Sequence, residues 1–186
     1  MNYEIIEKIG EGNKGEVFKV KLDNGKIAAL KWLKTDLAKK EYEFLKILNG
    51  FYAPKPFFIG KHYFIMELIE GRPLKELIGT KEYYETLKEA LIGAYELDLK
   101  KIYHTQLGRF YHVISTKKGI KFLDFERAKL TENPRNFLQI IGYYLQRDKK
   151  FDKKLLNEIV GVYKKDKVRG LDLAIKVLDE CIDETF

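Results

Sequence analysis

The sequence predicts an α+β chain of two lobes, in which an antiparallel sheet with one helix precedes a short, mainly helical part. Short strand patterns separated by turn residues fill the chain up to about residue 70, and amphipathic helix patterns dominate after residue 71. With 186 residues and 45% apolar content, the chain is long enough for two small lobes. We place the boundary in residues 68–71, giving a first domain over 1–70 and a second over 71–186.

The first lobe is predicted from alternating patterns and turns. Residues 3–9 lead as a strand into a glycine cluster, and residues 16–22 alternate apolar and polar side chains. The turn sequence at 23–25, Asp-Asn-Gly, is a strong hairpin signal, and residues 26–33 supply the returning strand.

A helix and a second hairpin complete the first lobe. We expect Asp36 to cap a helix with buried positions at 0, +3, +4 and +7, which are Glu41, Phe44, Leu45 and Leu48. Residues 57–59 and 62–66 predict two more strands around a turn at Gly60.

The second lobe is predicted as helices around a non-helical segment. Residues 81–97 form a helix, and strands at 113–115 and 121–123 flank a turn in a stretch from 103 to 125. Pro134 favours a helix that starts at 133–134, since proline suits a first helical turn. Two further amphipathic helices are expected at 153–164 and 171–181.

Composition narrows the function classes. No apolar run approaches the roughly 20 residues needed to cross a bilayer, and the first residues lack the pattern of a signal peptide. The single cysteine, Cys181, cannot form an internal disulfide. We therefore expect a cytoplasmic protein that does not enter membranes.

The first chemical motif is a glycine cluster between two strands. Gly10, Gly12, Gly15 and Val17 form the pattern G-x-G-x-x-G-x-V, whose glycines let backbone amides approach phosphates. The residues that follow form a strand, which favours a phosphate-covering hairpin over a dinucleotide site. Spaced glycines also occur in ordinary hairpins.

The second motif is a charged pair. Lys31 lies in the apolar strand sequence Ile-Ala-Ala-Leu-Lys, and a buried ammonium requires an anion. Glu41 on the following helix is the matching partner, whereas Glu43 points to another face and is solvated, although the choice rests on helix register. Alternatively, the lysine extends to water at the end of its strand.

The third and fourth motifs follow in order. Residues 64–71 place apolar side chains before a segment whose backbone, from Glu67 to Ile69, offers edge hydrogen bonds to an adenine. Asp124 comes directly after an apolar strand, before Phe125 and Glu126, and follows His104 by 20 residues.

These motifs, in this order and spacing, resemble the protein-kinase-like superfamily over residues 3–130, and most closely small atypical archaeal kinases related to the RIO type. The resemblance implies a bilobal kinase-like fold and binding of ATP and Mg²⁺ in the cleft between the lobes. It implies nucleotide contacts by Gly10, Gly12, Gly15, Val17, Ala29, Lys31, Met66, Glu67 and Ile69. It implies metal binding by Asp124 and His112, and catalytic roles for Lys31, Glu41, His104 and Gln106.

One departure concerns the catalytic loop, within residues 104–126. A kinase loop reads H-x-D-L-x-x-x-x-N, but here Gln106 stands at the aspartate position. The asparagine position falls on Tyr111, or on His112 if one residue is inserted. Gln106 cannot accept a proton, yet it can orient an acceptor, as a glutamine orients water in GTPases.

The function favoured by the sequence is an ATP–Mg²⁺-dependent phosphotransferase, a Ser/Thr protein kinase of atypical type with a protein substrate. The alternatives are a pseudokinase that binds nucleotide or a partner without turnover, and a small-molecule kinase. From 145 to 170 the chain holds nine Lys or Arg against four Asp or Glu. This basic stretch, over 147–169, is expected to be a solvated face that docks an acidic partner, or alternatively RNA.

Overall fold

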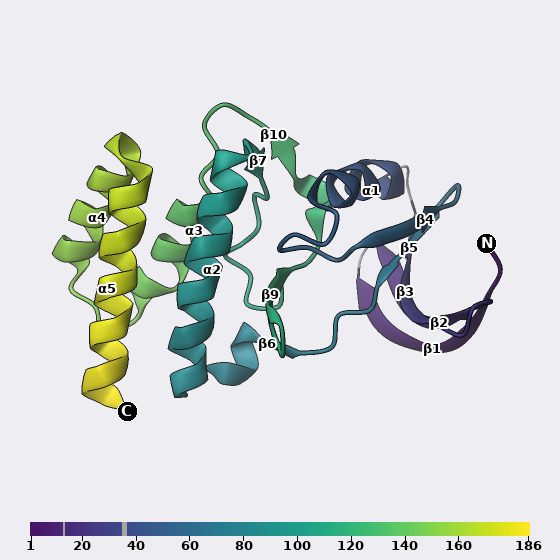
Figure 1. Ribbon diagram of the computed structural model, residues 1–186, viewed down its shortest axis with the longest axis horizontal. Helices are drawn as coiled ribbons and strands as arrows, with labels where there is room; N and C mark the ends of the chain where they lie inside the picture. Colours follow the sequence, from purple (N-terminus) through teal and green to yellow (C-terminus); the bar gives the residue numbers. More distant parts are fainter. Residues whose placement is uncertain (13, 35–36) are drawn as a thin grey trace. The chain divides into compact units, whose positions relative to one another are not determined.

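The computed structural model of the protein describes residues 1–12, 14–34 and 37–186. The chain divides into two compact units (Figure 1). Unit 1 consists of Met1–Glu70 and Lys121–Arg127, and unit 2 consists of Gly71–Ile120 and Ala128–Phe186. Unit 1 is built on a sheet and unit 2 mainly on helices, which confirms the predicted α+β class and the order of its two parts.

Within the described residues, the main sheet of unit 1 is antiparallel and has the strand order β1-β2-β3-β5-β4. The strands are β1 (Tyr3–Gly12), β2 (Gly15–Leu22), β3 (Ile27–Leu33), β4 (Pro56–Ile59) and β5 (Tyr63–Glu67). The predicted turn joins β2 to β3. There the Leu22 N–H donates to the Lys26 carbonyl at 2.9 Å, and Gly25 has a φ of +79°, which glycine adopts readily.

Both faces of this sheet bury side chains: a hydrophobic cluster packs on one face, and Ala29, Leu33 and Phe64 are buried on the other. Side chains alternate along each strand, so residues in register on neighbouring strands share a face. The buried cluster consists of Val20, Leu22, Ala28, Leu30 and Ile65. The opposite face presents the candidate nucleotide residues described below.

Helix α1 (Leu37–Leu48) follows β3. Its buried residues include all four predicted positions, Glu41, Phe44, Leu45 and Leu48. The spacing of 0, +3, +4 and +7 therefore located the buried face, because these positions form one stripe on a helix. The predicted cap, Asp36, lies outside the described residues.

Residues Lys121–Arg127 group with unit 1, although the sequence places them beyond the domain boundary. The Phe122 N–H donates to the Tyr52 carbonyl at 2.8 Å, and the Phe125 N–H donates to the Glu41 carboxylate at 3.1 Å. The ammonium of Lys121 also donates to backbone carbonyls, those of Gly50 and Ala53. These bonds join the segment to the loop after α1 and to α1 itself.

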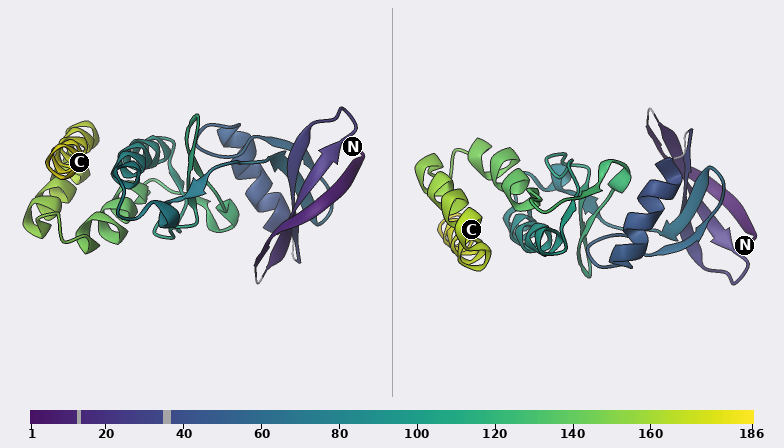
Figure 2. Two further views of the ribbon diagram at one scale, coloured as in Figure 1. Left: turned by 90° about the horizontal axis from the view of Figure 1, so that it is seen from below. Right: turned by 90° about the horizontal axis from the view of Figure 1, so that it is seen from above.

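Four α-helices form the bulk of the described part of unit 2: α2 (Lys81–Leu99), α3 (Asn136–Tyr143), α4 (Lys153–Lys165) and α5 (Lys167–Thr185). Helix α2 packs against α3 and α5, and α4 packs against α5, as the further views in Figure 2 show. Thr80, Asp152 and Asp166 cap α2, α4 and α5 by accepting backbone N–H bonds.

Short elements connect the helices. They are β6 (Arg72–Pro73), η1 (Leu74–Leu77), β7 (Ile102–Tyr103), β8 (Val113–Thr116), β9 (Gly119–Phe122), η2 (Phe125–Arg127), β10 (Lys129–Leu130) and η3 (Leu145–Arg147). Strand β7 pairs with β10, and β6, β8 and β9 form a sheet. The two-residue strands have too few positions to give an alternating pattern, so the sequence did not predict them.

Two helix starts differ from the prediction. Helix α3 begins at Asn136 and not at 133–134, because the N-cap Arg135 is non-helical, with φ −132° and ψ 33°. Helix α5 begins at Lys167 and not at 171, because the Asp166 side chain accepts the Arg169 N–H and starts the helix earlier. The aspartate N-cap therefore indicates the start of α5 better than the amphipathic pattern, which begins at residue 171.

The basic stretch is solvated as expected. Six of its lysines are exposed: Lys149, Lys150, Lys153, Lys154, Lys164 and Lys165. Among the described residues, no helix combines the length and the apolar character needed to cross a membrane.

Candidate functional site

The glycine cluster lies in strands β1 and β2 of unit 1, and Asn13, which belongs to the cluster in sequence, is outside the described residues. A Cβ added to Gly15 would lie 2.0 Å from the Trp32 carbonyl oxygen, so glycine is required there by the approach of β3. A Cβ on Gly12 would meet nothing within 4 Å, and neither residue has a positive φ. Packing against β3 therefore explains why position 15 is glycine. At Gly12 there is open space in which a ligand can approach the backbone.

This difference gives a pair of matched substitutions. Gly15→Ala is expected to lower the free energy of unfolding by about 2–3 kcal/mol, since the methyl group overlaps backbone atoms. Gly12→Ala is expected to change it by less than about 0.5 kcal/mol but to weaken nucleotide binding. Urea denaturation and ATP titration measure the two effects. Equal destabilisation by both variants would contradict the assignment.

The sheet register gathers the other predicted nucleotide residues of β2, β3 and β5. Val17 pairs with Lys31, and Ala29 pairs with Met66. Because Ala29 and Lys31 are two residues apart on one strand, all four share one face of the sheet. Glu67 and Ile69, at the end of β5 and beyond it, are half-buried in the same unit.

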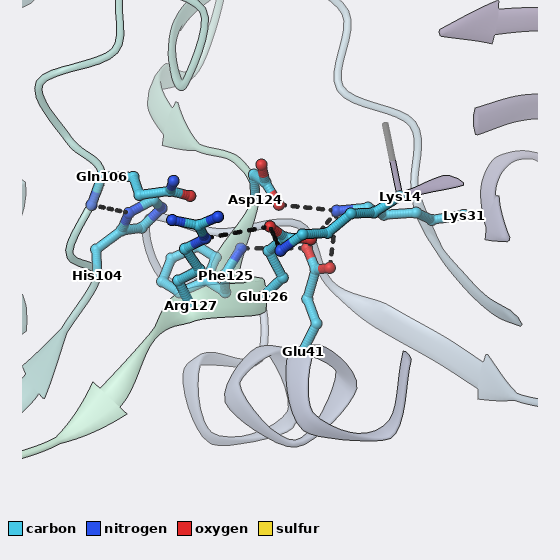
Figure 3. Close-up of polar contacts among 9 residues, drawn as sticks. All are labelled: Lys14, Lys31, Glu41, His104, Gln106, Asp124, Phe125, Glu126 and Arg127. Carbon is cyan, nitrogen blue, oxygen red and sulfur yellow. Dashed lines mark hydrogen bonds and ion pairs between the residues drawn. The ribbon is translucent and has the colours of Figure 1, made fainter. Parts of the chain in front are cut away.

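Lys31 is held between two carboxylates, as Figure 3 shows. Its ammonium donates to Glu41 at 2.7 Å and to Asp124 at 3.0 Å. Burial alone would lower the pKa of Lys31, but the two carboxylates outweigh it and raise this pKa to about 12. Lys31 is therefore charged at neutral pH and holds its ammonium at a fixed position.

Glu41 is the better buried of the two carboxylates, with 2% of its side chain exposed. Burial raises the pKa of Glu41, and the Lys31 ammonium and the Phe125 N–H oppose this rise. Glu43 is exposed and pairs with Lys46 on the surface. The structure thus brings Lys31 together with Glu41, the partner that the helix register favoured.

Asp124 has an unusual backbone, with φ +70°. This left-handed conformation costs energy for a residue other than glycine, although aspartate and asparagine tolerate it best. The next residue, Phe125, is fully buried and is bonded through its N–H to Glu41. Strain at this position is maintained by the surrounding contacts, as is common at functional sites.

A second charged pair in unit 1 was not predicted from the sequence. Lys14, in the glycine hairpin, donates to the Glu126 carboxylate at 2.8 Å, and the Arg127 Nε lies 3.7 Å from the same oxygen (Figure 3). Glu126 occupies the position that is glycine in a kinase D-F-G motif. A basic residue in the glycine loop and an acidic one after Asp124-Phe125 were the only sequence signals of this pair.

The loop after β7 carries His104 and Gln106 in unit 2. His104 is fully buried, and its Nδ1 accepts the Gln106 N–H at 3.3 Å. In the neutral ring the proton therefore resides on Nε2. Between these residues Thr105 has φ +70°, which is rare for a β-branched residue and marks a constrained turn.

A buried polar network anchors the start of this loop, and no sequence pattern predicts this network. Asn136, at the start of α3, accepts the His104 N–H at 2.9 Å and donates to the Ile102 carbonyl at 2.6 Å. The Asp98 carboxylate accepts four bonds, from Asn136 N and Nδ2, Phe137 N and the Tyr163 hydroxyl, at 2.8–3.3 Å. Burial raises the pKa of Asp98, and these donors oppose the rise.

The end of the loop places the two candidates for the asparagine position differently. Tyr111 is exposed, and the Lys75 ammonium lies 5.1 Å from its ring centre. His112 is buried, with its ring 5.8 Å from that of His104. Among the described residues, no group of three or more His, Cys, Asp or Glu side chains is placed to hold a metal ion.

Unit 1 fits a nucleoside triphosphate. The open space at Gly12 admits phosphates to the backbone, the fixed ammonium of Lys31 offers a positive charge, and Val17, Ala29 and Met66 supply apolar surface. Asp124 provides the carboxylate oxygens that Mg²⁺ prefers, and this ion is usually held by one or two carboxylates together with substrate phosphates.

The chain is similar to known proteins. A family model described as RIO domain matches residues 13–157. The chain is 25% identical over 183 residues to serine/threonine-protein kinase RIO2 of Saccharomyces cerevisiae, and 24% identical over 166 residues to serine/threonine-protein kinase rio2 of Schizosaccharomyces pombe. These matches cover 78% and 83% of this chain but 42% and 47% of the relatives. The chain thus spans less than half the length of these curated relatives.

Proposed function

Because the chain belongs to the RIO domain family, we propose that it is an ATP–Mg²⁺-dependent phosphotransferase, an atypical kinase that acts on serine or threonine residues of proteins. The observation that supports this most is Lys31 held between Glu41 and Asp124. Phosphoryl transfer depends mainly on positioning and on neutralising charge, and this arrangement supplies both.

Each residue of the site has a role in this proposal. Lys31 binds phosphate oxygens, and Glu41 fixes its ammonium in position. The glycine hairpin covers the phosphates, while the backbone from Glu67 to Ile69 binds the adenine edge. Asp124 holds Mg²⁺, which when bound neutralises the charge that develops on the transferred phosphoryl group.

Gln106 orients the hydroxyl of the acceptor. Among the described residues, its buried side-chain oxygen has no hydrogen-bond partner within the protein. A buried acceptor without a donor is costly, and an acceptor hydroxyl would satisfy it. His104 supports Gln106, since its ring accepts the Gln106 N–H.

A test of Gln106 compares two substitutions. Gln106→Asp is expected to preserve or raise the rate of phosphate transfer, because a carboxylate base in such a position contributes about 10²–10⁴-fold. Gln106→Ala is expected to lower the rate about tenfold through the lost hydrogen bond. Initial rates at saturating ATP measure both. A Gln106→Ala variant as active as wild type would place the acceptor at another residue, such as His112.

The proposed function itself is tested with γ-labelled ATP, with and without cell extract of the source organism, in Mg²⁺ and in Mn²⁺. We expect label on a protein serine or threonine, and a higher melting temperature in ATP–Mg²⁺, since a ligand of the native state stabilises it. The absence of a melting shift at millimolar ATP–Mg²⁺ would contradict nucleotide binding.

A pseudokinase is the second candidate, and the glutamine at position 106 favours it. Under this alternative, ATP raises the melting temperature but neither wild type nor Gln106→Asp labels any protein. The same experiment therefore separates the two functions.

A further inference from the structure

Unit 2 contains a pocket of about 380 Å³ that is separate from the residues assigned above. It lies beside α3, between this helix, β7 and η3. Its polar and aromatic lining residues are Tyr103, Arg135, Gln139, Tyr143 and Arg147, and Leu138 and Gly142 complete its wall. This volume is in the range of small-molecule sites, which bind ligands through a few polar groups among apolar walls.

Gln139 is the unusual residue of the pocket. Its exposed fraction is 9%, and among the described residues its side-chain Nε2 has no hydrogen-bond partner. A buried amide nitrogen without a partner destabilises the protein, so an acceptor from outside the chain would be bound favourably. The amide group can present its NH₂ or its oxygen, and an anionic ligand selects the NH₂.

Two guanidinium groups line the same pocket. Within the described part of the chain, neither Arg135 nor Arg147 forms an ion pair, and Arg147 stacks on the Tyr143 ring at 4.9 Å. Two carboxylates close to them in sequence have other partners. Glu132 pairs with Lys101 at 2.7 Å, and Asp148 accepts the Tyr84 hydroxyl at 2.8 Å. Among the described residues, no ion pair therefore neutralises the positive charge of these two guanidinium groups.

We propose that this pocket binds a phosphate monoester, with its phosphate held by Arg135, Arg147 and the Gln139 amide. Arginine forks match the oxygens of phosphate, and a dianion suits two guanidinium groups better than a carboxylate does. The Tyr103 ring and the volume beyond one phosphate group accommodate the organic part of the ester. The ligand is either a small metabolite phosphate or a phosphorylated side chain, which share this chemistry.

Isothermal titration of the whole chain with three probes tests the pocket. The probes are inorganic phosphate, O-phosphoserine and ribose 5-phosphate. We expect both esters to bind more tightly than inorganic phosphate, and the preferred ester indicates which source the pocket serves. Binding should weaken below about pH 6, where the phosphate monoester loses its second charge.

Three substitutions locate the binding. Arg135→Gln and Arg147→Gln should each weaken ester binding about tenfold, and Arg169→Gln, at an exposed arginine of α5, is the matched control without effect. Gln139→Leu should also weaken binding, but without lowering the melting temperature of the free protein, because it removes an unpaired buried amide. If Gln139 has only a structural role, Gln139→Leu will lower the melting temperature and leave ester binding unchanged.

The outcomes separate this proposal from the proposed kinase function. The variants Arg135→Gln, Arg147→Gln and Gln139→Leu should keep the rise in melting temperature that ATP–Mg²⁺ causes. If wild type shows this rise but binds no ester, the pocket proposal fails; if it binds the ester but shows no rise, the proposed kinase function fails. The proposal that this pocket binds the ester would be contradicted if Arg135→Gln and Arg147→Gln left ester binding unchanged. It would also be contradicted if Arg169→Gln weakened ester binding to the same extent. Tighter binding of a single-stranded RNA than of either ester would overturn the choice of a monoester.

Discussion

Replacing Asp124 with asparagine is expected to abolish phosphate transfer, by at least about 10³-fold, while the protein remains folded. Asparagine has the same shape but lacks the charge that holds Mg²⁺, so charge compensation at the transferred phosphoryl group is lost. Initial rates with labelled ATP measure the loss, and thermal unfolding verifies the fold.

The choice of asparagine follows from the backbone. Asp124 has φ +70°, a conformation that asparagine tolerates and alanine does not, so Asp124→Ala would combine loss of charge with strain. Lys31 keeps Glu41 as its partner in either variant. Asp23→Asn, at an exposed turn of the same unit, is the matched control and should retain full activity. Full activity of Asp124→Asn would exclude Asp124 as the metal ligand.

Replacing Asp98 with alanine is expected to lower the free energy of unfolding by about 3–5 kcal/mol. The carboxylate accepts four hydrogen bonds inside unit 2, and its removal leaves buried donors of Asn136 and Tyr163 without an acceptor. Urea denaturation measures the change. Activity should fall as well, because Asn136 anchors the backbone of His104.

Two comparisons make this result specific. Tyr163→Phe removes one bond of the network and should cost about 1–1.5 kcal/mol. Asp179→Ala removes a half-exposed carboxylate that pairs with Lys88, and should cost less than about 1 kcal/mol. If Asp98→Ala costs no more than Asp179→Ala, the network does not stabilise the fold.

The periodicity of apolar residues in the sequence predicted several strands and helices of this protein. The alternation in 16–22 and the Asp-Asn-Gly turn predicted β2 and its hairpin to β3, and the helical spacing of Glu41, Phe44, Leu45 and Leu48 predicted the buried face of α1. Such patterns are readable because side chains repeat every 2 residues in a strand and every 3.6 in a helix. The same periodicity favoured Glu41 over Glu43 as the partner of Lys31.

The sequence predicted the start of helix α3 incorrectly, because the prediction relied on Pro134. Pro134 suggested an early start for α3, but the side chain of Asn136 bonds to Ile102 and Asp98, and the helix begins there. The sequence shows that a residue is polar, but not which buried group it will meet. Contacts of this kind decide a boundary only when the chain is folded.

Only the tertiary structure decided which distant polar groups meet. Lys14 and Glu126 are 112 positions apart, and Asp98 and Asn136 are 38 apart, so no local pattern links them. The phosphate pocket likewise combines Tyr103 with residues of α3 and η3. The sequence by itself determined the elements and the motif residues within them, since burial repeats with the period of the backbone. Hydrogen bonds and ion pairs between residues far apart in sequence form only when the intervening chain brings these residues together. Their partners are therefore determined only when the whole chain packs.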